Sequence, residues 1–550
     1  MATKLSRRKF PSGLNPEDFK YQGRPSKDQD DFGDEVGIAD MACVSQFGDT
    51  NSDKYYHVGV VQAKGKWFVY CEWGRRFAGK SWGVVFAGQD YQFIECSTEH
   101  EARTEFQKKC RDKNIKNLVQ KTIAGKSIWV SKSTKKSGYI VQQLATREKG
   151  LPDAYFIKDS TGIQAKPKKK TAKKKTKKVS KNFQKQVVDL ARSLAGGTVQ
   201  YARDASEATG IVPTLDSINE VRDSLLDAAL QRLAVVGDDI KKQVQDKDLI
   251  DISNHVAALV PRKIPRYGSK ETRQQAVILS SQNILQIQQD LDAFESSLKN
   301  EDLFEEIEHD VGGVDPTQVF GGDITWIDPK STKGRWLEST FKSMSNNRHH
   351  YMRGKLTVKN IFEVSRPRCD DLFVKEVGKV AKKNKNRDFS HSARLQPKKR
   401  SDISDISDFA KDANVFLGIH GTRAVNVQPI LSSNLRLPKQ LKGVVITGAA
   451  FGSGIYFATD WRKSYGYTGH GNAYYGGGGT VKGRGFFMFL NDVVMGDPYM
   501  TKWTGSWTKP PNGKDSVAAY SEIATVQNDE HIIFNPNYQR IKYIIEGDLK

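Results

Sequence analysis

The sequence predicts a multidomain α+β protein, with a β-rich module, an all-α segment and a mixed α/β domain in that order. Its 550 residues suffice for about three or four domains, each with its own core. Short β-branched and aromatic runs, bounded by turn residues, occur over 41–120 and again beyond about 320, and they indicate strands. Between 182 and 300 the apolar spacing becomes that of amphipathic helices.

The chain is strongly basic, because its 86 Lys and Arg exceed its 64 Asp and Glu by 22. This excess predicts a polyanionic partner, which we expect to be nucleic acid rather than an anionic membrane. No apolar run approaches the roughly 20 residues of a membrane span, and the N-terminus lacks the apolar core of a signal peptide. We therefore expect a soluble intracellular protein. Its five cysteines contain no C-x-x-C pair, so we expect reduced thiols and no zinc module.

The first 125 residues divide into a tail and a β-rich module. Residues 1–40 are rich in Lys, Asp, Gly and Pro and poor in apolar side chains, which predicts a disordered tail. Residues 41–125 hold strand-like runs at 55–61 and 66–73, joined by a turn-prone Ala-Lys-Gly, and a helix at 101–113 closes this module.

Residues 126–181 are expected to form an insert followed by a lysine-rich linker. Ten of the sixteen residues at 166–181 are lysine, and like charges extend a chain instead of joining a core. A solvated spacer and a nuclear-import or DNA-backbone patch explain this run equally well.

Residues 182–300 predict a helical domain. Near its end one apolar face recurs at helical spacing; it contains Val277, Ile284, Ile287, Leu291, Phe294 and Leu298. Upstream, after a helix cap at Thr214, a second face contains Ile218, Val221, Leu225 and Leu233. Scaffolding alone explains such a segment until something links it to a site.

Residues 301–550 predict a mixed α/β domain with a mainly antiparallel sheet, since strand-like runs are closely spaced there. These runs are 355–364, 415–421, 453–459, 484–494 and 530–534.

One motif in the β-rich module matches the phosphate-binding loop G-x-x-x-x-G-K-[ST], at Gly74, Gly79, Lys80 and Ser81. That loop requires a helix directly after it, whose backbone N–H groups hold the phosphates. The residues that follow are Trp-Gly-Val-Val-Phe, which favour a strand. An ATPase is therefore disfavoured, although ATP hydrolysis abolished by Lys80→Ala would revive it.

Three polar side chains stand at the ends of apolar strand-like runs near the C-terminus: His420 in GIHGT, Tyr456 in GSGIYFAT and Glu530 in NDEHIIF. Taken singly, each has an ordinary structural explanation: a hydrogen-bonded histidine, a core tyrosine and a solvated glutamate.

Their order and surroundings resemble the His-Tyr-Glu signature of the poly(ADP-ribose) polymerase family. The stretches GIHGTRAVNVQPILSSNLRLP, TGAAFGSGIYFATDWRKSYGY and NDEHIIFNPNYQRIKYIIE carry the resemblance over some 130 residues. Upstream, DLIDISNHVAALVPRKIP resembles the helical regulatory domain of the DNA-dependent branch. TNSDKYYHVGVVQAKGKWFVYCEWGRRFAGKSWGVVF resembles its WGR module, with Trp73, Gly74 and Arg75 as the tripeptide. The chain looks like the smaller members, which lack zinc fingers.

The resemblance implies transfer of ADP-ribose from NAD+, the substrate, to an acceptor, without a metal. Glu530 would bond the ribose 2′-hydroxyl and help activate the acceptor, with His420 and Tyr456 completing the catalytic set. The implied NAD+ contacts are His420, Gly421, Thr422, Arg436, Tyr456, Ser464 and Tyr467. His420 would bond the adenosine-side ribose, Gly421 and Ser464 the nicotinamide amide, and Arg436 a phosphate, while the two tyrosines would sandwich the nicotinamide.

The acceptor side departs from the pattern of the polymer-forming members. Ala450 and Asn528 stand where larger side chains are usual, and Ser453 replaces a usual lysine. ADP-ribosyl transfer survives these changes, while long-polymer synthesis is less certain. We expect the chain to modify itself and other proteins with ADP-ribose, as a polymer, in the response to DNA damage. Transfer of single units only, and a silent scaffold that binds DNA ends, stay open as alternatives.

The resemblance also implies control by DNA ends or nicks. Trp73 would pack on the terminal nucleotide of a break, and Arg75 would link its module to the helical domain. Core packing of Trp73 is an equal alternative. The expected partners are DNA and protein acceptors, including the chain itself, and the expected state is a monomer. We expect a nuclear protein in a eukaryote and otherwise a cytoplasmic, DNA-associated one.

Overall fold

The structure is a computed structural model with two compact units, one formed by Met1–Lys174 and Arg203–Ser280 and the other by Lys175–Ala202 and Ser281–Lys550. The described residues are 2–15, 18–26, 28–45, 52–75, 90–132, 138–142, 183–209, 213–262, 269–281, 283–299, 315–345, 354–387, 389, 400, 402–438, 450–470 and 478–550.

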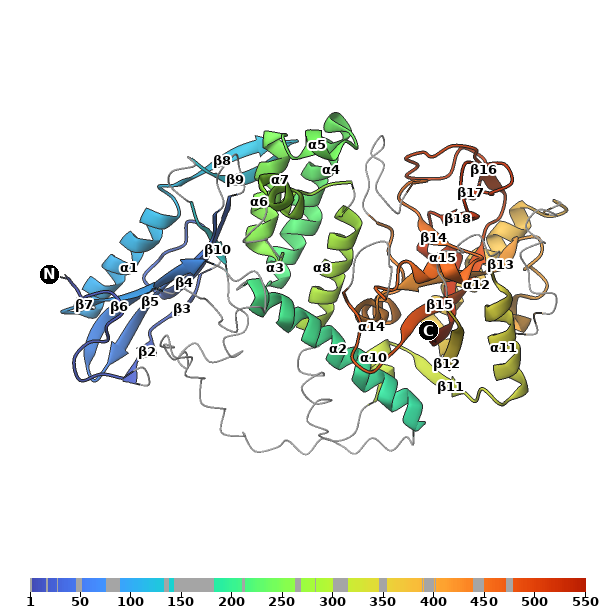
Figure 1. The fold of residues 1–550 in the computed structure, drawn as a ribbon, viewed down its shortest axis with the longest axis horizontal. Helices are drawn as coiled ribbons and strands as arrows, with labels where there is room; N and C mark the ends of the chain where they lie inside the picture. Colours follow the sequence, from blue (N-terminus) through green and yellow to red (C-terminus); the bar gives the residue numbers. More distant parts are fainter. Residues whose placement is uncertain are drawn as a thin grey trace. The chain divides into compact units, whose positions relative to one another are not determined.

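The first unit contains an eight-stranded sheet of order β1-β7-β6-β5-β4-β10, with β2 paired to β5 and β3 to β4 (Figure 1). Its strands are β1 (Thr3–Lys4), β2 (Lys20–Tyr21), β3 (Arg24–Pro25), β4 (Val36–Ser45), β5 (Ser52–Ala63), β6 (Lys66–Arg75), β7 (Asp90–Cys96) and β10 (Ile140–Gln142). Lys64 and Gly65 both take positive φ between β5 and β6, which is the backbone of a tight hairpin turn. The helix predicted at 101–113 is confirmed as α1 (Glu99–Lys113), capped by Thr98.

The predicted disordered tail over 1–40 is wrong for the described residues. This segment supplies β1, β2, β3 and the start of β4, and Phe19, Tyr21 and Phe32 are buried in the unit's two cores. Its few apolar side chains are therefore almost all used in packing, which composition averaged over forty residues conceals.

The predicted boundary at 125/126 also differs from the structure. A two-stranded hairpin, β8 (Leu118–Ile123) with β9 (Lys126–Ser131), spans it. Beyond the hairpin, β10 pairs antiparallel with β4, so 138–142 belongs to the main sheet and not to an insert. The lysine run at 166–181 lies outside the described residues.

Short helices complete the first unit. They are α3 (Leu215–Glu220), a π-helical turn (Val221–Leu225), α4 (Leu226–Val236), α5 (Ile240–Gln243), α6 (Lys247–Leu259) and α7 (Lys270–Val277). The capping role expected of Thr214 is confirmed, since its side chain accepts from the Ser217 N–H in a reciprocal capping box. All four residues of the upstream apolar face, from Ile218 to Leu233, are buried.

The second unit is built on a five-stranded antiparallel sheet of order β11-β12-β19-β15-β13 and a four-stranded sheet of order β14-β18-β17-β16 (Figure 1). The first sheet contains β11 (Asp323–Ile327), β12 (Leu356–Ser365), β13 (Val415–Thr422), β15 (Phe486–Val494) and β19 (Gln539–Leu549). The second contains β14 (Ile455–Phe457), β16 (Pro498–Met500), β17 (Ser516–Ala519) and β18 (Glu530–Ile533). The helices are α10 (Pro316–Phe320), α11 (Thr332–Ser343), α12 (Pro367–Lys383), α14 (Ala424–Ser433) and α15 (Trp461–Tyr465), with 3-10 turns at Ser404–Ile406 and Pro536–Tyr538.

The segment predicted as one helical domain is shared between the two units, and two further helices, α2 and α8, belong wholly or partly to the second unit. The N-terminal part of α2 (Lys185–Thr209) buries Val187, Leu190, Ala191 and Leu194 in the same core as Val425 and Phe487. This i, i+3, i+4, i+7 spacing is one helix face. The single downstream helix expected through Val277 and Ile284 is instead broken into α7 in the first unit and α8 (Ile284–Lys299) in the second.

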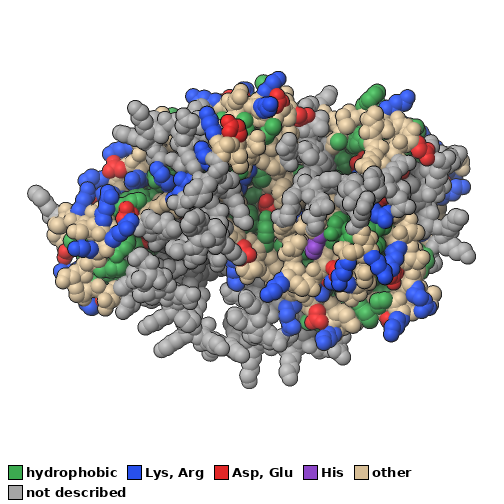
Figure 2. Space-filling model, in the orientation of Figure 1, with side chains coloured by type: hydrophobic (Ala, Val, Ile, Leu, Met, Phe, Trp, Pro, Cys, Tyr) green, Lys and Arg blue, Asp and Glu red, His purple; other side chains and the backbone are tan. Residues whose placement is uncertain are grey.

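On the face shown in Figure 2, Lys and Arg side chains are scattered, with Asp and Glu among them, instead of being gathered into one patch. Among the helices that the structure describes, none is both long and apolar enough to cross a membrane.

Candidate active site

Strand pairing brings together the three residues that the sequence singled out. The β14 and β18 strands pair with Tyr456 opposite Ile532 and Phe457 opposite His531, which places Glu530 one step beyond, at the Ala458 end. Ala458 in turn exchanges two backbone hydrogen bonds with Ile419 of β13, at 2.8 and 2.9 Å. His420, Tyr456 and Glu530 therefore lie on three strands joined at one point.

His420 is held as a neutral imidazole. Its Nδ1 lies 3.0 Å from the Tyr456 carbonyl oxygen, and because a carbonyl only accepts, Nδ1 carries the proton. Burial lowers the pKa of His420, an effect that this carbonyl opposes in part. In this tautomer Nε2 is the acceptor nitrogen, suited to a ligand hydroxyl.

Tyr456 joins the site to the loop before its strand. Its hydroxyl accepts from the Phe451 N–H and donates to the Gly452 carbonyl, both at 2.8 Å. The phenol is thus satisfied by backbone, and its ring is what remains for a ligand. The sandwich of the nicotinamide ring between Tyr456 and Tyr467 stays a prediction.

Glu530 has a cationic neighbour that sequence reasoning missed. Lys463 Nζ, on α15, lies 2.5 Å from Glu530 Oε2, and the two side chains keep only 11% and 18% of their surface exposed. A pair this enclosed is stronger than a surface pair and fixes the carboxylate in place. Its only sequence signal was the position of Lys463 directly before Ser464.

Gly421 is required by a close approach of β13 to α15. A Cβ built on Gly421 would stand 1.9 Å from the Ser464 carbonyl oxygen, so any side chain would force these elements apart. Ser464 itself is buried, with its Oγ 3.5 Å from the Ile419 carbonyl. Thr422, the last residue of β13, is also buried. The structure brings Gly421 and Ser464 together, as the NAD+ hypothesis needs.

Arg436 is engaged by acidic side chains of α8. Its Nη1 lies 2.9 Å from Asp292 Oδ1 and 3.2 Å from Glu295 Oε2. The phosphate contact predicted for Arg436 would compete with these carboxylates for Nη1. The α8 helix also supplies Asp290, whose Oδ1 is 2.8 Å from Arg423 Nη2.

Asn426, on α14, is a second residue that the sequence analysis missed. It is 3% exposed, yet neither its Oδ1 nor its Nδ2 has a hydrogen-bond partner within the described part of the chain. Orphaned polar atoms at a buried position indicate a missing ligand or water. They fit NAD+, whose riboses and amides carry both donors and acceptors. In the sequence of α14, AVNVQPILSS, this Asn stands between two valines.

The proposed DNA contacts lie elsewhere, on the first unit. Trp73, on β6, is partly buried and stacks on Tyr56, with ring centroids 6.1 Å apart and planes at 21°. The Arg7 guanidinium lies 5.4 Å from the Trp73 ring. Arg75 ends β6 opposite Lys54. This packing fits the core alternative for Trp73, and its contact with a nucleotide stays a prediction. Gly79, Lys80 and Ser81 of the phosphate-loop motif lie outside the described residues.

Comparison with known proteins agrees with the geometry of the second unit. Residues 336–548 match the family model of the poly(ADP-ribose) polymerase catalytic domain. The chain is 33% identical over 153 residues to protein mono-ADP-ribosyltransferase PARP4 of Mus musculus, covering 26% of this chain and 7% of the relative. It is 36% identical over 101 residues to protein mono-ADP-ribosyltransferase PARP3 of Gallus gallus, covering 18% and 16%.

A viral protein aligns over more of its own length. The putative poly [ADP-ribose] polymerase-like 100L of Invertebrate iridescent virus 6 is 29% identical over 140 residues, which cover 23% of this chain and 67% of the relative. This chain spans less than a fifth of the length of the mouse and chicken proteins. Across the residues described, no cluster of three or more His, Cys, Asp and Glu is arranged to hold a metal.

The matched segment contains His420, Tyr456, Lys463 and Glu530 around one strand junction. Residues 336–548 therefore resemble a poly(ADP-ribose) polymerase catalytic domain, and this match supports NAD+ ADP-ribosyltransferase chemistry for the segment.

Proposed function

We propose that the chain transfers ADP-ribose from NAD+ to protein acceptors, including itself, and that DNA ends or nicks switch this activity on in the response to DNA damage. The observation that carries the transferase proposal is the convergence of His420, Tyr456 and Glu530 through the β13-β14-β18 junction. Control by DNA rests on the resemblance of the first unit to a WGR module and on the basic charge of the chain.

The reaction breaks the bond between ribose C1′ and the nicotinamide nitrogen of NAD+. Nicotinamide leaves with the bonding electrons, and positive charge develops on the ribose, as in glycoside cleavage. The Glu530 carboxylate would accept the 2′-hydroxyl hydrogen bond and stabilise that charge. The acceptor oxygen or nitrogen then bonds C1′, and its proton passes to Glu530.

The remaining residues position NAD+. The neutral His420 would accept an adenosine-side ribose hydroxyl at Nε2, while Gly421 and Ser464 would hold the nicotinamide amide and Asn426 a polar atom of the adenosine half. Lys463 would hold the Glu530 carboxylate in its orientation, and so acts through Glu530 as a positioning residue.

The α8 helix would hold the basal state closed. Asp292 and Glu295 engage Arg436, so an NAD+ phosphate at Arg436 Nη1 would compete with these carboxylates. Asp290 also ties α8 to the buried Arg423. A ligand that prefers the state in which α8 has moved away would raise the competent population. DNA bound through Trp73 and Arg75 would be that ligand.

Removal of 182–300 is not a suitable test of this control. That deletion would strip Leu190, Leu194 and Leu291 from the second unit, and all three are fully buried. Loss of buried Leu side chains costs several kcal/mol each, about 2–5 per residue. Neutralising the acidic side chains of α8 tests the same idea without unfolding the unit.

Transfer of single units is favoured over long polymers by the acceptor side. Ser453 and Asn528 are 8% and 5% exposed, so neither presents a side chain to a growing polymer. Two of the relatives carry the name mono-ADP-ribosyltransferase. A gel of self-modified protein distinguishes the two products: one discrete shifted band indicates single units, whereas a high smear indicates polymer.

Labelled NAD+, supplied with and without nicked or blunt-ended DNA, tests the proposal as a whole. We expect protein labelling that requires both DNA and Glu530, with Glu530→Gln as the control. Labelling that is the same with and without DNA would contradict the proposed control by DNA and would support the transferase activity. No labelling with either DNA would contradict both.

A further inference from the structure

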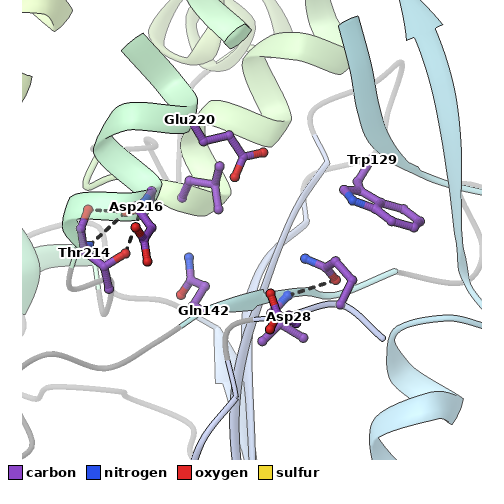
Figure 3. A pocket seen from close by; sticks show the side chains of 10 residues that line it. Asp28, Trp129, Gln142, Thr214, Asp216 and Glu220 are labelled. Carbon is purple, nitrogen blue, oxygen red and sulfur yellow. Dashed lines mark hydrogen bonds between the residues drawn. The ribbon is translucent and has the colours of Figure 1, made fainter. Parts of the chain in front are cut away.

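A cavity of about 260 Å³ lies within the first unit, at the meeting of the sheet and the helices. Among its lining residues are Asp28 from the segment before β4, Trp129 from β9, Gln142 from β10, and Asp216 and Glu220 from α3. Figure 3 shows the side chains of Glu220, Asp216, Asp28 and Trp129 around a common space, with Gln142 extending toward its centre. The cavity is near the lower end of the size range of small-ligand pockets.

The lining of this cavity has the opposite charge to the chain. Its ten lining residues include three carboxylates, Asp28, Asp216 and Glu220, and no Lys, Arg or His, whereas the whole chain carries a net charge of +22. A cavity whose lining carries the opposite sign to the rest of the protein attracts cations.

Among the described residues, the ion-pair partner of Glu220 is a histidine, His255, and this histidine is neutral. Glu220 Oε1 lies 3.5 Å from Nε2 of the buried His255, and burial lowers the pKa of His255 to about 4. His255 Nδ1 accepts from the Trp129 N–H at 3.4 Å, so His255 is neutral and its Nε2 carries the proton. Partial desolvation raises the pKa of Glu220, while 44% of its side-chain surface stays exposed and accessible to a ligand.

Gln142 gives a second and independent indication of a ligand. It is 8% exposed, it lines the cavity, and its Nε2 has no hydrogen-bond partner anywhere in the described chain. A buried amide donor left in this way costs about 1–3 kcal/mol unless a ligand or water accepts from it. The carboxylates favour a cation, and Gln142 Nε2 favours an acceptor, so a ligand that carries both suits the cavity best.

The arrangement disfavours a bare metal ion. The carboxylates are spread around the cavity, and within the described residues no metal-holding group of His, Cys, Asp and Glu is formed. The Trp129 indole offers no ligand atom for a metal ion, but its face stacks well on a guanidinium or an alkylammonium.

We propose that this cavity binds a basic side chain, arginine above lysine, of an extended peptide. The guanidinium would lie on the Trp129 indole with its N–H groups on Glu220 and Asp216, and a peptide carbonyl would accept from Gln142 Nε2. The cation, the planar face and the adjacent acceptor then all come from one ligand. Binding at this site involves no catalysis, so the peptide-binding proposal does not depend on the transferase proposal.

Equilibrium binding of a fluorescein-labelled Gly-Arg-Gly-Arg-Gly peptide to the full chain tests the site, measured by anisotropy at about 150 mM salt. There the Debye length is about 8 Å, so long-range attraction is screened. We expect saturable binding that is lost when citrulline replaces arginine. Equal binding of the citrulline peptide, or no binding, overturns the proposal.

Matched variants locate the site. Glu220→Gln should weaken binding about tenfold or more, and Trp129→Ala should do the same, whereas Trp129→Phe should retain most of it. Asp238→Asn removes an exposed carboxylate of the same unit outside the cavity and should change nothing. If Glu220→Gln and Asp238→Asn bind alike while melting like the unaltered protein, the cavity is not the site.

Two competitors test the chemistry further. Spermidine supplies cations without a carbonyl, and Mg²⁺ supplies charge without a planar face, so neither should displace the peptide at concentrations equal to it. Displacement by either at those concentrations would contradict the peptide assignment.

The chain itself is one possible source of the basic segment, since ten lysines follow at 166–181. A variant with these lysines changed to glutamine distinguishes the sources. Tighter binding of added peptide to this variant identifies the chain's own run as the occupant, and unchanged binding identifies a separate protein. Either result supports the proposed site, whereas absence of peptide binding to both the unaltered chain and the variant overturns the proposal.

Discussion

The ammonium of Lys463 lies 2.5 Å from the carboxylate of Glu530. Lys463 is held by the short α15 helix, whose cap Asp460 accepts from the Arg462 N–H at 2.8 Å, and Glu530 begins β18. The pair thus joins a helix to a strand at the point where NAD+ is proposed to react. Lys463 therefore orients the Glu530 carboxylate.

Lys463→Met should lower kcat of ADP-ribosyl transfer by about 10²-fold, because a positioned charge at a reacting centre is worth this much. KM for NAD+ should change little, since Lys463 is not placed against the substrate. Lys463→Arg should recover part of the rate by restoring the charge. Equal losses in Lys463→Met and Lys463→Arg, with KM raised in both, would show that the lysine serves packing instead.

Gly421→Ala should destabilise the second unit and abolish NAD+ binding, because the added methyl meets the Ser464 carbonyl at 1.9 Å. Gly378→Ala is the matched control, since nothing lies within 4 Å of its Cβ on α12. The control should raise stability by about 0.5–1 kcal/mol, as alanine does inside a helix. Thermal melting and NAD+ titration of the two variants check this prediction.

The double variant Asp292→Asn/Glu295→Gln should raise transferase activity in the absence of DNA. It removes both carboxylates that engage Arg436, and the loss of about 1–2 kcal/mol of pairing would raise the competent population about 5- to 30-fold. Asp371→Asn, an exposed acid on α12, is the control. Basal activity equal to that of the control would remove α8 from the control mechanism.

The second unit should lose stability as the pH falls from 7 to 5, and His531 should be one cause. Burial lowers the pKa of His531 to about 4, against about 6.5 in the unfolded chain. The unfolded state therefore binds the proton first, and stability is lost below pH 6.5 until pH 4 is reached. The loss amounts to about 2 kcal/mol at pH 5.

Denaturation of His531→Gln at pH 7 and pH 5 measures that contribution. We expect a shallower fall in the free energy of unfolding than in the unaltered protein. His100→Gln, at an exposed position of α1, should leave the fall unchanged. An identical slope in all three proteins would mean that His531 is protonated to the same extent in both states.

Local pattern was enough to predict much of the secondary structure. The runs at 355–364, 415–421, 484–494 and 530–534 lie within or overlap β12, β13, β15 and β18. These segments are rich in β-branched and aromatic residues and are bounded by turn residues. Their local sequence alone therefore favours a strand.

Pairing between distant segments was not predictable in the same way. The β1 strand pairs with β7 and β2 with β5, so 1–40 is ordered by partners far along the chain, and its composition gave no sign of them. The break between Val277 and Ile284 follows the division into two units, although the apolar spacing continues across it. The spacing of apolar residues predicts which face of a helix is buried, but it does not predict which unit that face packs against.

The site shows the same limit. His420, Tyr456 and Glu530 were identified by order and resemblance, and strand pairing brings them to one junction. Lys463, Asn426 and the acids of α8 were missed, because their importance lies in contacts across long sequence separations. A lysine beside a serine, or an asparagine in a helix, has no local signature of a site.

The most direct test of the account is the separation of NAD+ binding from nicotinamide release in Glu530→Gln, with nicked DNA present. If Glu530 stabilises charge on the ribose, the variant should bind NAD+ within a few-fold of the unaltered protein and release nicotinamide about 10²- to 10³-fold more slowly. Nicotinamide release at an undiminished rate would contradict the proposed role of Glu530 and with it the proposed reaction centre.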